Sequence, residues 1–436
     1  MRRHSLTVLA VLAVLALVGC TAAPTATLTP SPSLAPTPTP TSASTATASP
    51  GPTTSPTATP TVAPTARPTS SPTATPTASP TLAPPTPTAA PSGWVELTGF
   101  PTYGRRTHIT GIAYGGGRFV AVGWSIRSGN TRGRVWTSTD GRSWTAAPDT
   151  AFAGLTLEAV THSGTAFYAF ASAPTSVWRS SNGTSWQRVN LPEAGGELGT
   201  FNAFTGGSVI DATADGGTMY AAGETTLHGG DIACDGTCVA VWRSTNGTDW
   251  DSSIVVDGDV FGTFAVRPGL ALVITYGNYI GQGPWYSTDF DSWSAPPGVE
   301  LGEGSGLLDA ASDGSRIVAV GYAGDLYDEA IALVTDGNNW TIVPIDSTAG
   351  SPAEQVAWAG GKFVAIGAVT WWSADGLTWQ RGPDVPYPPP DDPGPEPGDD
   401  PFVRRTVGAG GPAVVLAQTY DEGLHVWFAP LSAFDD

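Results

Sequence analysis

Apolar residues follow three different patterns along this chain of 436 residues. A continuous apolar run occupies residues 6–19, bulky apolar residues are sparse over 21–92, and short apolar strands recur at a regular spacing from residue 93 onward. Such shifts in pattern mark boundaries between parts of a chain. We therefore expect a signal peptide at 1–19, a disordered tether that begins with a cysteine at 20–92, and one folded domain at 93–436.

One apolar strand recurs seven times in the third part. Its aligned first residues lie 46 to 52 positions apart, at Phe119, Phe167, Met219, Ala271, Ile317, Phe363 and Val414. This period is typical of the four-stranded blade of a β-propeller. Glycine and β-branched residues abound and there is a single lysine, Lys362, which argues against a mainly helical fold.

A tight turn follows six of these strands. Each turn places an aspartate or asparagine four residues before a tryptophan, and in five of the six a glycine lies between them as Asp-Gly or Asn-Gly. Such pairs tolerate positive φ and favour a hairpin, and the side-chain oxygen accepts backbone N–H bonds across its own turn. The six pairs are Asp140 with Trp144, Asn182 with Trp186, Asn246 with Trp250, Asp289 with Trp293, Asp336 with Trp340, and Asp375 with Trp379.

These turns resemble the Asp-box, or BNR, repeat of the sialidase-like propellers. The resemblance implies an all-β fold, a seven-bladed β-propeller, with structural Asp-box residues on one face. The box here has three residues between the acid and the tryptophan, one fewer than usual. The stretch 102–108 does not match the first arginine motif of sialidases, and no arginine triad can be placed. The resemblance therefore assigns no catalytic residue.

The seventh repeat has no box, and the chain ends before a fourth strand. Residues 93–101, however, look like a fourth strand with no blade before it. We expect residues 94–98 to complete blade seven and close the ring, since closure removes an exposed sheet edge.

The N-terminus carries the features of a secretory signal. Arg2 and Arg3 precede an apolar run that is short for a membrane span, and it ends at Leu17-Val18-Gly19-Cys20. This ending resembles a bacterial lipobox, which implies cleavage before Cys20 and a diacylglycerol on its sulfur. The Thr, Pro, Ala and Ser of 21–92 favour an extended tether. We expect a lipid-anchored protein of the bacterial cell envelope with its domain on the extracytoplasmic side.

Two cysteines, Cys234 and Cys238, enclose three residues in blade three. Outside the membrane such a pair is expected to be a disulfide. A metal site would need more ligands than His228, the nearest candidate, and we expect neither metal nor cofactor.

The net charge belongs to the folded part. Residues 93–436 contain all 38 acidic residues and 16 of the 19 basic ones. That balance excludes nucleic acid as a partner and weighs against anionic ligands, sialic acid included. We expect a monomeric propeller.

Long, varied loops lie on the face opposite the boxes, and binding concentrates in such loops. The candidate binding residues there are Trp124, Arg127, Arg132, His228, Tyr276, Tyr279, Tyr327, Asp328 and Tyr420. Aromatic and charged side chains of this kind suit a sugar or a peptide. The leading hypothesis is a non-catalytic surface propeller that binds an extracellular glycan or protein. The alternatives are a sialidase-like glycoside hydrolase or lyase, and an envelope assembly or scaffolding factor.

Overall fold

The computed structural model describes residues 93–436, apart from 105, 173–174, 191–206, 226–236, 258–259, 277–282, 325–328, 347–349, 385–403, 412, 421–422 and 436. The signal peptide and tether expected from the sequence lie outside the described residues. No helix in the described part of the chain is long and apolar enough to cross a membrane.

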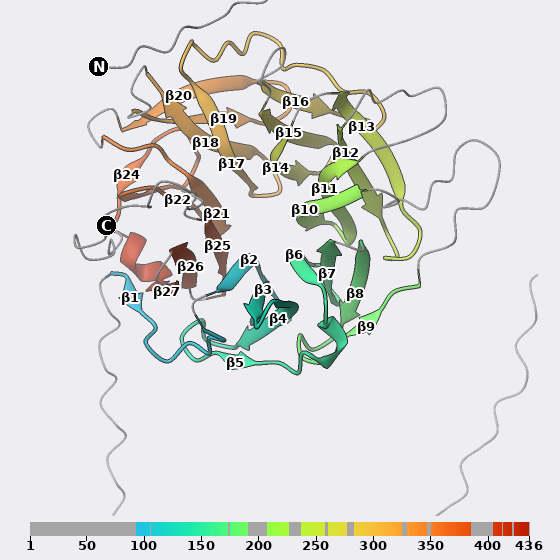
Figure 1. Ribbon diagram of the computed structural model, residues 1–436. Helices are drawn as coiled ribbons and strands as arrows, with labels where there is room; N and C mark the ends of the chain where they lie inside the picture. The colour runs from blue at the N-terminus through green and yellow to red at the C-terminus, as the bar shows by residue number, and fades with distance from the viewer. Residues whose placement is uncertain are drawn as a thin grey trace, which may run out of the picture. The chain divides into compact units, whose positions relative to one another are not determined.

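Seven antiparallel sheets stand around a central axis like the blades of a propeller (Figure 1). Each blade turns one strand toward the axis. These innermost strands are β2 (Thr107–Gly115), β6 (Thr156–His162), β10 (Gly207–Asp215), β14 (Val260–Arg267), β17 (Gly306–Ser312), β21 (Gln355–Ala359) and β25 (Arg404–Gly410). The expected all-β, seven-bladed fold is confirmed.

The other strands follow in order toward the rim of the ring. The second strands are β3 (Arg118–Arg127), β7 (Phe167–Ser172), β11 (Thr218–Thr225), β15 (Leu270–Tyr276), β18 (Ile317–Ala323), β22 (Lys362–Ile366) and β26 (Ala413–Tyr420). The third are β4 (Asn130–Ser138), β8 (Ser176–Ser180), β12 (Cys238–Ser244), β16 (Gly283–Ser287), β19 (Glu329–Thr335), β23 (Thr370–Ser373) and β27 (Gly423–Pro430). The outermost are β5 (Thr145–Ala146), β9 (Gln187–Arg188), β13 (Asp251–Asp257), β20 (Trp340–Asp346), β24 (Gln380–Arg381) and β1 (Val95–Glu96). In blade four a single bridge between Tyr286 and Ser294 takes the outermost place.

Strand β1 closes the ring as expected from the sequence. Val95 lies opposite Phe428 and Glu96 opposite Trp427, so β1 becomes the fourth strand of the blade formed by β25, β26 and β27. The amide of Leu97 extends the ladder with a 2.8 Å bond to the carbonyl of Val426. The N-terminal and C-terminal segments of the propeller are therefore held in one sheet, in which β1 covers the edge that β27 would otherwise expose.

Each box turn forms hydrogen bonds between its own side chains and its own backbone. Asp140 Oδ1 accepts the amides of Arg142 and Ser143 at 2.8 and 2.7 Å, and the indole of Trp144 donates to the carbonyl of Gly141 at 2.9 Å. The five other boxes repeat the pattern of two amides on one side-chain oxygen. The box is thus a turn that satisfies its own backbone, which is the role of a structural element.

Cationic side chains join neighbouring blades on the box face. Arg118 of blade one donates to the carbonyl of Asn182 in the next box at 2.9 Å, and Arg316 of blade five donates to that of Asp375 at 2.6 Å. Lys362 holds the equivalent position in blade six and donates to Phe434 at 2.6 Å. Phe434 belongs to the short 3₁₀ helix η2 (Leu431–Phe434), so η2 takes the place of the missing seventh box.

Five of the innermost strands contain a β-bulge near their start, where one extra residue interrupts the pairing with the second strand. The second strand must approach the bulge closely, and glycine makes that possible. A Cβ on Gly123 would lie 1.9 Å from the carbonyl oxygen of His108, and one on Gly321 would lie 1.9 Å from that of Gly306. The bulge also fixes which side chain of the innermost strand faces the axis.

Candidate functional site

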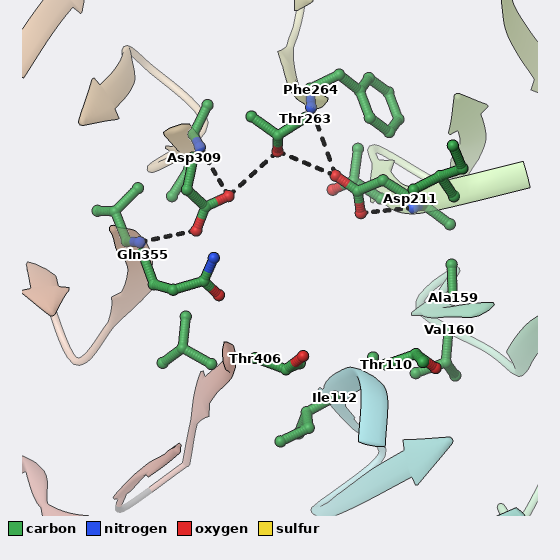
Figure 2. A pocket seen from close by; sticks show the side chains of 18 of the residues that line it. Thr110, Ile112, Ala159, Val160, Asp211, Thr263, Phe264, Asp309, Gln355 and Thr406 are labelled. Carbon is green, nitrogen blue, oxygen red and sulfur yellow. Dashed lines mark hydrogen bonds between the residues drawn. The ribbon is translucent and has the colours of Figure 1, made fainter. Parts of the chain in front are cut away.

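A cavity of about 610 Å³ occupies the centre of the ring and is lined by the innermost strands of all seven blades (Figure 2). The register places one equivalent residue of each strand at the same level of its wall. In blade order these residues are Gly111, Ala159, Asp211, Thr263, Asp309, Gln355 and Thr406. The wall is therefore polar along blades three to seven and small or apolar along blades one and two.

Two carboxyl groups of this wall tie neighbouring blades together. Asp211 in β10 accepts the amide of Phe264 in β14 at 3.4 Å, and Asp309 in β17 accepts the amide of Val356 in β21 at 2.8 Å. Each carboxyl also accepts the amide of its own following residue, at 2.7 and 2.9 Å. Both carboxyl groups thus contribute to the cohesion of the ring.

Thr263 connects the two acids. Its Oγ1 lies 3.2 Å from Asp211 Oδ2 and 3.1 Å from Asp309 Oδ1, so a row of three side chains crosses blades three, four and five (Figure 2). Other threonines at the cavity also form hydrogen bonds to a neighbouring blade. Thr110 donates to the carbonyl of Leu157 at 2.7 Å, and Thr406 donates to that of Ile109 at 3.4 Å.

The surroundings favour the neutral form of these acids. Burial raises the pKa of Asp309 to about 7, and the nearby charge of Asp211 acts in the same direction, while its bonds to backbone amides oppose the rise. Burial also raises the pKa of Asp211. Although the cavity gives both side chains some solvent access, its wall is formed by protein on all sides. Water inside the cavity therefore solvates a charge less well than bulk water does.

Two tyrosines pack over innermost strands beside the cavity, on the face opposite the boxes. We call Tyr276 and Tyr322 the tyrosine rim; they hold equivalent positions near the ends of β15 and β18. A Cβ on Gly262 would lie 2.7 Å from the ring of Tyr276, and one on Gly306 would lie 2.8 Å from the hydroxyl of Tyr322. These glycines therefore let both rings lie over the innermost strands rather than outside them.

Tyr276 of the rim lies close enough to Asp309 for the two groups to interact electrostatically. The Tyr276 hydroxyl donates to the carbonyl of Leu308 at 3.3 Å, one residue from Asp309. Burial raises the pKa of Tyr276, and the proximity of Asp309 and Tyr322 raises it further. Its side chain is nevertheless 37% exposed, so an aromatic surface remains accessible beside the cavity.

The structure places three other candidates from the sequence in blade one. Trp124 holds the position equivalent to the rim tyrosines, with its ring stacked on His108 at 4.0 Å. Arg127 is exposed at the end of β3, and Arg132 pairs with Asp149 at 3.2 Å. Outside the described residues lie His228, Tyr279, Tyr327 and Asp328, and the side chain of Tyr420 is not described either.

Both acids and Tyr322 are absent from the candidates that the sequence predicted. The signal for Tyr322 was present, because it aligns with Trp124 and Tyr276 in the repeated strand. The innermost strands carried a weaker signal, since their register depends on the bulge.

The predicted cysteine roles depend on residues that the structure does not describe. Cys238 is buried at the start of β12, while Cys234 and Cys20 lie outside the described residues. The disulfide and the lipid site therefore remain predictions. Within the described ranges, no group of three or more His, Cys, Asp or Glu side chains could hold a metal ion.

No family model and no curated protein matches this chain. Similar solved structures include an acylaminoacyl peptidase of Pyrococcus horikoshii, at 10% identity and a TM-score of 0.48, covering 76% of this chain and 53% of that one. A YCF48 protein bound to a D1 peptide is 14% identical with a TM-score of 0.48, covering 77% and 94%. Virginiamycin B lyase from Staphylococcus aureus is 11% identical with a TM-score of 0.47, covering 77% and 97%. The chain spans about half the length of the peptidase, and at these identities the likeness concerns the fold alone.

Proposed function

We propose that this chain is a lipid-anchored protein of the bacterial cell envelope whose propeller binds an extracellular glycan or protein segment without transforming it. The tyrosine rim is the observation that carries the proposal. Aromatic rings with accessible faces can stack on a sugar ring or on a peptide side chain. Tyr276 offers such a face directly beside the cavity.

The bonding of the acids supports a binding role over a catalytic one. A general acid or base must exchange its proton with a substrate within hydrogen-bond reach. Asp211 and Asp309 each accept two backbone amides and also contact Thr263, so their oxygens are occupied by the fold. A substrate would have to displace bonds that hold the blades together.

A glycoside hydrolase or lyase is the second candidate, and one observation favours it. Asp309, with a pKa raised to about 7, lies next to a second carboxyl at the cavity wall. Glycosidases use a pair of carboxyl groups of which one is kept protonated near neutral pH. The two candidates differ in whether Asp309 is needed for turnover.

Arrays of glycans and of peptides, probed with the detergent-solubilised full-length protein, test the proposal. A pooled glycoside-hydrolysis assay is run on the same preparation. We expect binding that falls at least tenfold in Tyr276→Ala and stays unchanged in Leu377→Ala, an exposed apolar residue in a box turn on the opposite face. Hydrolysis by the wild type that disappears in Asp309→Asn would replace the binding proposal by the enzymatic one.

A further inference from the structure

One hydroxyl group stands between two carboxyl groups at the cavity wall. Thr263 Oγ1 lies within hydrogen-bond distance of both Asp211 Oδ2 and Asp309 Oδ1, at 3.2 and 3.1 Å. A hydroxyl carries one proton and donates once, whereas an ionised carboxylate can only accept. If both acids were ionised, one of the two contacts would join two oxygen atoms with no proton between them.

A single added proton makes both contacts favourable. A protonated carboxyl donates to the Thr263 oxygen, and the Thr263 hydroxyl then donates to the other, ionised carboxylate. The other hydrogen bonds of the two carboxyl groups do not change the number of protons that this row needs. The backbone amides that reach each carboxyl are donors in either state and place no proton beside Thr263.

The groups that face this row of side chains include no positive charge that could take the place of the added proton. The titratable groups around it are Glu158 from β6 across the cavity, Glu224 from β11, which accepts the Phe261 amide of β14 at 3.2 Å, Tyr276 from β15 and Tyr322 from β18. Among the described residues that line the cavity there is no lysine, arginine or histidine. Arg404 and Arg405 belong to β25, and their side chains lie outside the described part.

We propose that Asp211, Thr263 and Asp309 hold one proton in common, and that this proton joins blades three, four and five into a unit that loosens when the proton is lost. The proton is taken up from solvent and released to it. The chain of bonds runs through β10, β14 and β17, and the tyrosine rim lies over the last two of these strands. The support of the rim is therefore sensitive to pH, whether or not the rim binds a glycan.

The direction of the pH effect follows from linkage. The folded protein holds the proton of Asp309 up to a pH of about 7, whereas the unfolded chain releases it near 3.8. The contribution to stability is thus complete below about pH 4 and is lost as the pH rises through about 7, with the unfolding constant increasing by about tenfold per pH unit between them. The four box aspartates have a lowered pKa, so their own titration lies below this window.

A ¹³C NMR titration of the aspartate carboxyl carbons in the full-length protein tests the shared proton. We expect two carboxyl signals to move together in one step near pH 7. The variants Asp211→Asn and Asp309→Asn assign the two signals. Neither signal should change in Asp251→Asn, an exposed control in β13. Movement of one signal alone, or of none between pH 5 and 8, would overturn the proposal.

The Asp211→Asn variant separates the coupling of Asp309 to Asp211, by charge and through Thr263, from the effect of burial. Its amide can donate to Thr263, which frees the hydroxyl to donate to an ionised Asp309. We therefore expect the Asp309 titration to shift down by at least one pH unit. An unchanged midpoint would mean that burial alone protonates Asp309, and the shared proton would be rejected. If this variant does not fold, the joint movement of the two wild-type signals, assigned through backbone correlations, decides the question.

Discussion

Trp94 connects the closing strand to the body of the propeller, and its removal tests whether closure stabilises the fold. The side chain lies directly before β1, is only 9% exposed and packs edge-on against Phe434 with ring centroids 6.2 Å apart. It shares a buried cluster with Trp372 of blade six and Trp427 of blade seven. Truncation to alanine would therefore leave a cavity where two blades and the closing strand meet.

The expected loss can be worked from burial. Replacing a buried tryptophan by alanine costs about 3–5 kcal/mol. With an unfolding entropy of about 2.1 cal/mol/K per residue, a propeller of about 340 residues should lose roughly 4–7 °C in Tm. Among the described residues the buried indole nitrogen of Trp94 has no hydrogen-bond partner, so none of the hydrogen bonds described is lost with it. Trp94→Phe should accordingly cost less than about 1.5 kcal/mol, because it keeps much of the apolar contact.

Differential scanning calorimetry and denaturant unfolding measure this effect. Val95→Ala is the matched control, since it changes the neighbouring residue on the same strand at a side chain that is 40% exposed, and we expect a change within about 0.5 kcal/mol. A Trp94→Ala protein that unfolds at the wild-type midpoint would show that β1 is an accessory strand and that the ring holds without it.

Three further predictions concern other parts of the chain. Asp375→Ala removes the acceptor of the Leu377 and Thr378 amides, both at 2.9 Å, and should lower the free energy of unfolding in urea by about 1–2 kcal/mol at pH 7. Because the pKa of Asp375 is lowered, the difference from wild type should shrink as the pH falls through that pKa. A difference that stays constant with pH would contradict the assigned bonds. Gly321→Ala should destabilise by about 1–3 kcal/mol, since its Cβ would lie 1.9 Å from a backbone oxygen. A wild-type urea midpoint would show that the strand can move away. Cys20→Ala should shift the protein from the membrane fraction to the soluble fraction and abolish acyl labelling, while retention without label would refute the lipid anchor.

The fold was predictable because its signals are local. An Asp-Gly pair such as Asp140-Gly141 specifies a hairpin within a few residues, and the recurring strand specifies a blade on its own. The closure by β1 was also predictable, since an unpaired fourth strand at one end of the sequence matched a blade lacking one at the other.

The candidate site was less accessible from sequence because its residues come from strands about fifty positions apart. Asp211 and Asp309 each look like single acids in an ordinary strand. Only the ring brings them to the same hydroxyl of Thr263. Burial there raises the pKa of both acids, and the charge of Asp211 raises that of Asp309 further. Tyr276 was identified as an aromatic residue near a long loop, but the inward tilt of its ring depends on Gly262 in another strand.

The tyrosine rim is the central claim about function, and one binding isotherm tests it most directly. The strongest array ligand is titrated into wild type, Tyr276→Ala, Tyr322→Ala and Leu377→Ala under the same conditions. The account predicts a Kd at least tenfold weaker for both tyrosine variants, equal to wild type for Leu377→Ala, and unchanged ligand recovered after each titration. Wild-type affinity in both tyrosine variants would contradict the account and would show that the ligand binds somewhere other than the tyrosine rim.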